Sequence, residues 1–296
     1  MRCFEKLIFA RLYKHLLTNR ILAKEQYGFI SNSSTESVAY NVINEITQAM
    51  NDRRALEGLF CDLEKAFDCV NHRILLEKLE FYGIKGKFLD LIQSFLQGRY
   101  QRVLINKIVA YEDASSGWTT VTHGVPQGSI LGPLLFIIYI NDLPLLSGIN
   151  LKIVLFADDT SSIMTSSNQA EHKTILYKTL SDLNSWFKAN LLSLNINKTC
   201  LLYFRNNNNI DNTLTIHYMN KTITNIPSVK FLGLLMHDTL KLGQAHKSNS
   251  FKTELCMLRS ACTYPSVINK CIKDAILFLC TLNYLLRHNF LGCFYK

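Results

Sequence analysis

The sequence lacks the patterns that mark secreted, zinc-binding and membrane-spanning chains. Its nine cysteines include no Cys-x-x-Cys pair, their number is odd, and no signal peptide precedes them. This favours reduced thiols and argues against a zinc site. The longest late apolar run, Ala275–Leu286, has 12 residues, whereas a membrane span needs about 20. We therefore expect a core helix there, and an intracellular protein of the nucleus or cytoplasm with no membrane partner.

Acidic residues are scarce relative to basic ones. The chain has 32 Lys and Arg against 23 Asp and Glu, which gives a formal charge of +9. Such a balance suits a polyanionic partner such as nucleic acid, although many basic proteins bind none. With 296 residues and 48% hydrophobic content, the chain can build one large domain or about two.

Two adjacent carboxylates, Asp158 and Asp159, stand between the β-prone segments 151–155 and 161–164. We expect a hairpin with both acids at its turn. One interpretation is a solvated turn, because Asp accepts turn geometry. The other is a cation site, because the acids follow an apolar strand and adjacent like charges repel unless a cation lies between them. Mg²⁺ suits this site, since it binds one or two carboxylates plus substrate phosphates.

A third candidate carboxylate, Asp62, ends the predicted strand 56–61 and precedes a predicted helix that contains residues 74–82. An acid where a strand turns into a helix lies at the usual mouth of an α/β or α+β site. It can equally be a cap for the following helix. The separation from Asp158 is 158 − 62 = 96 residues, so only tertiary folding can bring these acids together.

A loop rich in Gly and Pro, residues 124–133, leads into an apolar helix with Pro133 in its first turn and Pro144 past its end. Glycine lets a phosphate or base approach the backbone, and a helix N-terminus favours anions. A tight turn before a core helix explains the same residues.

The remaining patterns predict helices over 4–16, 35–46, 88–96 and 169–192, with Ser34 or Thr35 as the cap of the second. They also predict strands over 99–105, 199–204 and 214–219. An Asn-rich turn at 206–209 is expected to join the last two strands.

These blocks, in this order, resemble the palm of reverse transcriptases, and most closely the jockey-type clade of non-LTR (LINE-type) retrotransposons. The main matches are Asp62 to Asp68 (DLEKAFD), Gly124 to Pro144 and Phe156 to Asp159 (FADD). Further matches are Gln26 to Phe29, Ser34-Thr35, Trp186-Phe187, Asn190, Leu194-Asn195, Lys198-Thr199 and Phe231 to Gly233.

The resemblance implies an α+β fold: a polymerase right-hand palm, in which an antiparallel sheet packs on helices, with partial fingers and a degraded thumb. It covers 1–247 as the reverse transcriptase domain, with partial fingers over 1–55 and mainly palm over 56–247. Residues 248–296 stand in the place of a truncated, thumb-like helical segment. Ile30 stands where the family usually has a basic residue near the incoming triphosphate. We expect a chain truncated at both ends, without the endonuclease or RNase H parts of fuller elements.

The resemblance also implies roles for the three acids. Asp62, Asp158 and Asp159 would be the catalytic residues and would hold two Mg²⁺ ions, with Mn²⁺ as an alternative. Asp62 and Asp158 would be the main ligands and Asp159 the weaker partner. Asp68 is expected to have a structural or hydrogen-bonding role.

Substrate-binding roles follow from the same resemblance. Phe67 matches the steric gate against a ribose 2′-hydroxyl, with a plain core aromatic as the alternative. Gln127 and Gly128 match the block that lines the template and incoming base, and Lys198 matches a lysine near the nucleotide phosphates. The primer grip is matched by three consecutive residues, Phe231, Leu232 and Gly233.

Three functions are compatible with these features. The leading one is an RNA-directed DNA polymerase (reverse transcriptase) of a retrotransposon, a nucleotidyltransferase that uses an RNA template, a DNA primer and dNTPs. The second is an inactive remnant that at most binds nucleic acid. The third is a two-metal nuclease, which leaves Phe67 and the 124–133 loop unexplained. The sequence does not determine the oligomeric state.

Overall fold

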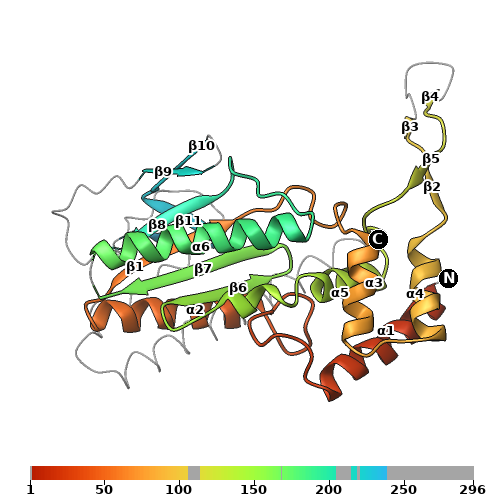
Figure 1. Ribbon diagram of the computed structural model, residues 1–296, viewed down its shortest axis with the longest axis horizontal. Helices are drawn as coiled ribbons and strands as arrows, with labels where there is room; N and C mark the ends of the chain where they lie inside the picture. Colours follow the sequence, from red (N-terminus) through yellow and green to blue (C-terminus); the bar gives the residue numbers. More distant parts are fainter. Residues whose placement is uncertain (1, 106–113, 168, 205–214, 219–220, 239–296) are drawn as a thin grey trace, which may run out of the picture. The chain divides into compact units, whose positions relative to one another are not determined.

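The computed structural model describes residues 2–105, 114–167, 169–204, 215–218 and 221–238 (Figure 1). The predictions for the Asn-rich turn at 206–209, for the thumb-like segment 248–296 and for the helix over 275–286 lie outside the described residues. The helices are α1 Arg2–Thr18, α2 Thr35–Asn51, α3 His72–Phe81, α4 Lys87–Leu96, α5 Leu131–Tyr139 and α6 Gln169–Ala189, with a 3₁₀ turn η1 at Leu143–Leu146.

The strands form one four-stranded sheet and four two-stranded pairs. In the large sheet the order is β6-β7-β1-β8, and the pairs are β2–β5, β3–β4, β9–β10 and β11–β12. Figure 1 shows β6 and β7 side by side as a hairpin. The strand bounds are β1 Ala55–Cys61, β2 Arg99–Gln101, β3 Leu104–Ile105, β4 Ala114–Ser115, β5 Thr119–Val121, β6 Leu151–Phe156, β7 Asp159–Ser166, β8 Cys200–Phe204, β9 Thr215–Tyr218, β10 Lys221–Thr224, β11 Ser228–Phe231 and β12 Leu234–His237.

The chain folds as two compact units. The first contains Met1–Ser33, Phe60–Ser162 and Ile175–Thr199, and the second contains Ser34–Leu59, Ile163–Thr174 and Cys200–Lys296. Strands β1 and β7 each contribute residues to both units. The end of β1 and the start of β7 belong to the first unit, which therefore contains all three candidate acids.

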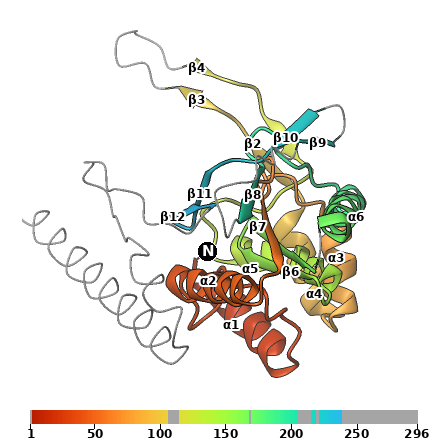
Figure 2. The same cartoon turned by 90° about the vertical axis from the view of Figure 1, so that its left-hand side faces the viewer.

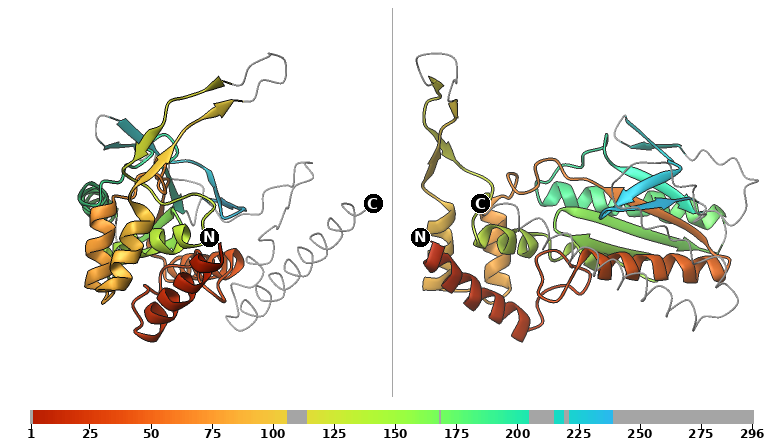
Figure 3. Two further views of the ribbon diagram at one scale, coloured as in Figure 1. Left: turned by 90° about the vertical axis from the view of Figure 1, so that its right-hand side faces the viewer. Right: turned by 180° about the vertical axis from the view of Figure 1, so that it is seen from behind.

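Helix α5 forms the centre of the first unit. Every residue from Leu134 to Ile140 is buried, which explains why the helix is apolar on all sides and has no polar face. Helices α1 and α3 pack against α5, and α4 packs against α3 (Figure 3). The Lys78 ammonium of α3 donates hydrogen bonds to the Tyr139 carbonyl (2.6 Å) and to the Asp142 carboxylate (2.7 Å) just after α5.

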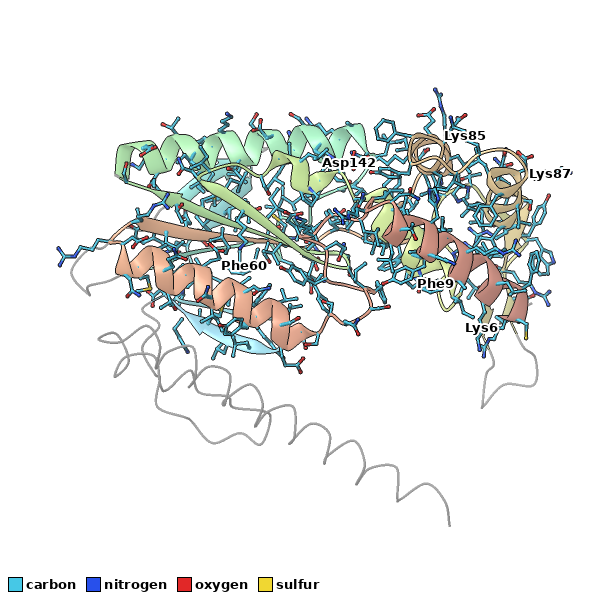
Figure 4. All side chains as sticks on the ribbon, turned by 90° about the horizontal axis from the view of Figure 1, so that it is seen from below. Lys6, Phe9, Phe60, Lys85, Lys87 and Asp142 are labelled. Atoms are coloured by element: carbon cyan, nitrogen blue, oxygen red, sulfur yellow. The ribbon has the colours of Figure 1, made fainter. Side chains whose placement is uncertain are left out.

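Other parts of the first unit are more exposed. The strands β2 and β5 form a ribbon that leads on to β3 and β4 (Figure 2). The expected single strand over 99–105 is divided into β2 and β3 at residues 102 and 103. Figure 4 shows Lys6 and Phe9 on α1, Lys85 in the turn between α3 and α4, and Lys87 at the start of α4.

In the second unit, α2 buries the apolar stripe that its sequence predicts. Val38, Val42 and Ile46 are at most 1% exposed. Ser34 is the N-cap, and it forms a capping box with Ser37, so the choice between Ser34 and Thr35 is settled in favour of Ser34.

The second unit also contains a buried charged side chain that the sequence patterns did not indicate. Glu57 of β1 and His172 of α6 are 0% and 1% exposed, with 2.9 Å between Glu57 Oε2 and His172 Nε2. The other ring nitrogen of His172 lies 3.0 Å from the Ser166 hydroxyl. Because a carboxylate only accepts, the His172 Nε2–H donates to Glu57.

Candidate active site

Asp62 follows the last residue of β1, as predicted, and a distant segment holds it there. The Asn195 N–H donates to the Asp62 carbonyl (2.8 Å), and the Glu64 N–H donates to the Ser193 carbonyl (2.9 Å). Residues 62–64 and 193–195 thus pair as two short antiparallel segments. The Asn195 side-chain amide donates a further bond to Asp62 Oδ2 (2.9 Å).

Asp158 lies in the two-residue turn between β6 and β7, and Asp159 is the first residue of β7. The other turn residue, Ala157, has a φ of +56°, a conformation typical of tight hairpin turns. The Gln26 side-chain oxygen accepts hydrogen bonds from the Ala157 N–H (3.2 Å) and the Gly28 N–H (2.7 Å). This contact fixes the turn from outside the hairpin.

Gly28 allows the approach between these two segments. A Cβ atom at Gly28 would lie 2.1 Å from the Ala157 backbone nitrogen, which is far closer than any real contact. Gln26 forms a parallel bridge with Leu155, at the end of β6. The segment from Gln26 to Gly28 therefore packs directly against the strand end that carries the acids.

The three acids are electrostatically coupled. Partial desolvation, the Asp158 charge and the Asp62 charge together raise the pKa of the Asp159 carboxyl above its ordinary value. Asp62 and Asp159, which are 159 − 62 = 97 residues apart in sequence, therefore lie within electrostatic reach of each other.

The acids fit a divalent cation in chemistry and charge. Carboxylate oxygens are the ligands that hard cations prefer, and gathered like charges favour binding of a counter-ion. Among the described residues, no three His, Cys, Asp or Glu side chains form a ready-made metal cage. A cation that is completed by substrate phosphates needs only one or two protein carboxylates, so the acids suit such a cation rather than an enclosed structural metal.

Lys198 also lies at the site. Its ammonium is 3.5 Å from Asp62 Oδ2, and its side chain is 69% exposed, against 32% for Asp62. The structure thus brings Lys198 next to a candidate catalytic acid. An exposed pair of this kind contributes little to stability.

Phe67 combines features of a core residue and an exposed one. Its ring stacks on the fully buried Phe136 at 4.3 Å between centroids, and the Phe29 ring lies perpendicular to it at 6.3 Å between centroids. The side chain is nevertheless half-buried rather than enclosed. Packing therefore fixes the ring while part of it remains accessible.

The Gly-Pro loop is attached to the segment after Asp62. Gly124 has a φ of +80°, and a Cβ atom there would lie 2.8 Å from the Asp68 carbonyl oxygen. The Gly124 carbonyl accepts from His72 Nε2 (2.8 Å), and burial lowers the pKa of His72, which favours the neutral ring. Asp68 accepts a hydrogen bond from the Gln127 side chain (2.9 Å), as expected for a hydrogen-bonding role.

Gln127 and Gly128 are both exposed on this loop. Gly128 has a φ of +78°, and no atom lies within 4 Å of the position of a Cβ. Open space at this backbone position is what the approach of a ligand requires. At the end of the loop, the N–H of Ile130 donates to the carboxylate of Glu5 from α1 (2.9 Å), which places an acid at the N-terminus of α5.

The three primer-grip candidates lie in the second unit. Phe231 ends β11 and is 5% exposed, while Leu232 and Gly233 form the turn to β12 with φ values of +47° and +90°. Positive φ at both central residues is typical of a two-residue hairpin.

Sequence reasoning missed three residues that hold this site in place. Gln26 and Asn195 fall within matched blocks, but no local pattern assigns them partners 131 and 133 residues away. Glu5 contacts Ile130, 125 residues away. The sequence feature that could have indicated these roles is chemical: Gln26 and Asn195 carry amide side chains next to segments without regular structure.

Comparison with known proteins agrees with the resemblance drawn from the sequence. A family profile described as Reverse transcriptase (RNA-dependent DNA polymerase) matches residues 1–236. Over 84% of its length the chain is 27% identical to the probable RNA-directed DNA polymerase from transposon BS of Drosophila melanogaster, of which it covers 27%. Over 86% of its length it is 26% identical to the RNA-directed DNA polymerase from mobile element jockey of Drosophila funebris, of which it covers 28%.

The chain therefore spans little more than a quarter of these relatives. Among solved structures, apo telomerase from Candida tropicalis has a similar fold, with a TM-score of 0.50 at 12% identity, over 79% of this chain and 41% of that chain. The likeness concerns the fold alone and agrees with the predicted α+β class. No helix within the described residues is both long enough and apolar enough to cross a membrane.

Proposed function

Because the chain belongs to the reverse transcriptase family, we propose that it performs RNA-directed DNA synthesis, adding dNTPs to the 3′-hydroxyl of a DNA primer along an RNA template. The observation that carries the proposal is that Asp62, just after β1, lies within electrostatic reach of Asp159, which begins the neighbouring strand β7 directly after Asp158. Because these substrates occur inside the cell, the proposed site of the activity is the nucleus or cytoplasm.

The family uses divalent cations, and here we assign two Mg²⁺ ions to Asp62, Asp158 and Asp159. When bound, the ions stabilise the charge on the attacking and leaving oxygens of an in-line phosphoryl transfer. Asp62 and Asp158 are the main ligands, and Asp159 is the weaker partner. Asn195 holds the backbone and side chain of Asp62, and Gln26 holds the backbone of the turn that carries Asp158.

Lys198 is the residue we assign to the nucleotide phosphates. Its ammonium already lies beside Asp62 and is mostly exposed, so a phosphate can attract it at small energetic cost. A lysine in this position can also donate a proton to the departing pyrophosphate.

Phe67 is assigned the selection of dNTPs over ribonucleotides, because its ring is fixed by Phe136 and remains partly accessible. Gln127 and Gly128 are assigned to the template and incoming base, supported by their exposure on the Gly-Pro loop. The turn at Leu232 and Gly233, with Phe231 before it, is assigned to the primer backbone.

The test is primer extension on an RNA template with dNTPs and Mg²⁺. We expect incorporation that EDTA abolishes and that Asp158→Asn reduces at least about a hundredfold. Asp90→Asn removes an exposed aspartate of α4 and should leave the rate unchanged. Incorporation that Asp158→Asn does not alter would exclude the assigned site, while salt-sensitive RNA binding without any incorporation would favour a binding remnant. Cleavage of nucleic acid that Asp62→Asn abolishes would instead indicate a nuclease.

A further inference from the structure

The carboxylate of Asp62 is held from one side by the loop that follows α6. The backbone N–H of Asn195 donates to the Asp62 carbonyl at 2.8 Å, and its side-chain amide donates to Asp62 Oδ2 at 2.9 Å. One residue thus fixes both the backbone and the side chain of the candidate ligand.

Asn195 is itself well anchored. Its carbonyl accepts hydrogen bonds from the Thr199 N–H (2.9 Å), the Thr199 hydroxyl (2.9 Å) and the Lys198 N–H (3.1 Å). Thr199 is only 6% exposed, so a buried residue holds the turn. The amide of Asn195 therefore acts on Asp62 from a rigid support.

Among the described residues, the donors from this loop approach the same oxygen of Asp62, Oδ2. Both Asn195 Nδ2 and Lys198 Nζ approach Oδ2, at 2.9 and 3.5 Å. A carboxylate that is hydrogen-bonded through one oxygen presents the other to a cation in a defined direction, as ligands supported by neighbouring groups do.

We infer that Asn195 is a positioning residue for the reaction: its amide orients Asp62 so that Oδ1 is the oxygen that binds the cation. The inference rests on the proposed function for its catalytic meaning. A neutral amide suits this task, because it orients the carboxylate without cancelling the negative charge that attracts the cation. An aspartate at the same position would replace the donor with an acceptor and add a fourth like charge.

A purely structural role predicts something different. If Asn195 only attached the loop to β1, its backbone bonds would suffice, and any loss would appear as reduced stability. Asn190 provides the matched control, because it lies in the same connection, is 5% exposed and bonds through its side chain to Trp186 rather than to Asp62.

The experiment measures the thermal unfolding midpoint of the full chain during a titration with Mn²⁺, each variant against its own metal-free value. A cation that binds the folded state raises this midpoint. We expect Asn195→Ala and Asn195→Asp to need about ten times more Mn²⁺ for half of the shift. Asn190→Ala should match the wild type in Mn²⁺ requirement even where its metal-free midpoint is lower, and Asp62→Asn should weaken the response at least as much as Asn195→Ala.

Several results would overturn the inference: a wild-type chain that Mn²⁺ does not stabilise, Asn195→Ala titrating as the wild type does, or Asn190→Ala weakening the response equally. Primer extension separates this inference from the proposed function. A normal Mn²⁺ response that depends on Asn195, without any incorporation, would uphold the positioning role and reject polymerase activity. If the wild type does incorporate dNTPs, Asn195→Ala should recover much of the lost rate when the Mg²⁺ concentration is raised. A variant that had lost its fold would not recover in this way.

Discussion

Replacing His172 with leucine should destabilise the second unit more than most single substitutions. His172 and Glu57 are 1% and 0% exposed, and the ring donates to the Glu57 carboxylate at 2.9 Å. Glu57 Oε1 has no hydrogen-bond partner within the described residues. After His172→Leu, the other oxygen of the carboxylate loses its ring donor as well.

The size of the effect follows from the burial. Leaving a buried carboxylate without its hydrogen-bonding partner costs about 3–5 kcal/mol, because its charge is then uncompensated. This is a large part of a total stability of about 5–15 kcal/mol. At about 2–4 °C per kcal/mol for a chain of this size class, the unfolding midpoint should fall by about 6–20 °C.

Urea unfolding followed by circular dichroism measures this loss. His123→Leu is the control, because His123 is exposed and its replacement should change the free energy of unfolding by less than about 0.5 kcal/mol. The double variant Glu57→Leu/His172→Leu should recover most of the loss, since apolar residues can replace a buried pair at little cost. A single His172→Leu variant within about 1 kcal/mol of the wild type would refute the reasoning.

Three further predictions concern the site itself. Since the folded pKa of Asp159 is raised above its unfolded value of 3.8, ionisation of this carboxyl opposes folding as pH rises above about 4. Asp159→Asn should therefore lower incorporation yet add a few tenths to about 1 kcal/mol to the free energy of unfolding near pH 7. Urea titrations below about pH 4 should show no such gain in stability. Gly28→Ala should lower the free energy of unfolding by about 3 kcal/mol, because the new Cβ would collide with the Ala157 nitrogen. Gly148→Ala, where a Cβ has open space, should be nearly neutral, and equal thermal unfolding midpoints for the two variants would contradict this. Phe67→Val should raise ribonucleotide use relative to dNTP use at least about tenfold in competition assays, and an unchanged ratio would reduce Phe67 to a core aromatic.

The sequence predicts those parts of the fold that local chemistry determines. The turn between β6 and β7, the strand before Asp62 and the buried helix α5 follow from short apolar runs, turn residues and Pro positions. The strand over 99–105 was predicted as continuous, but the structure divides it, because apolar and β-prone residues do not reveal where pairing changes partner.

The partners of the site residues were not predictable in the same way. Gln26 reaches Ala157 and Asn195 reaches Asp62 across more than 130 residues, and hydrophobic periodicity carries no information on such contacts. The Glu57–His172 pair is similar, since a glutamate in a buried strand looks anomalous until its partner on α6 is known.

The arrangement of strands explains why Asp62 lies near Asp158 and Asp159, which are distant from it in sequence. In the sheet, β7 lies between β6 and β1, and Asp159, at the start of β7, senses the charge of Asp62, just after β1. Asp62 therefore lies within electrostatic reach of Asp159, and Asp158 directly precedes Asp159 in the turn before β7. The side chains that fix these ends, Gln26 and Asn195, are neutral amides. Of the cationic side chains that the structure describes, Lys198 is the one within 4.0 Å of Asp62, and it is 69% exposed. Since neutral donors leave the charge of the acids intact and the Lys198 ammonium is easily displaced, the site keeps the negative potential that the proposed divalent cation requires.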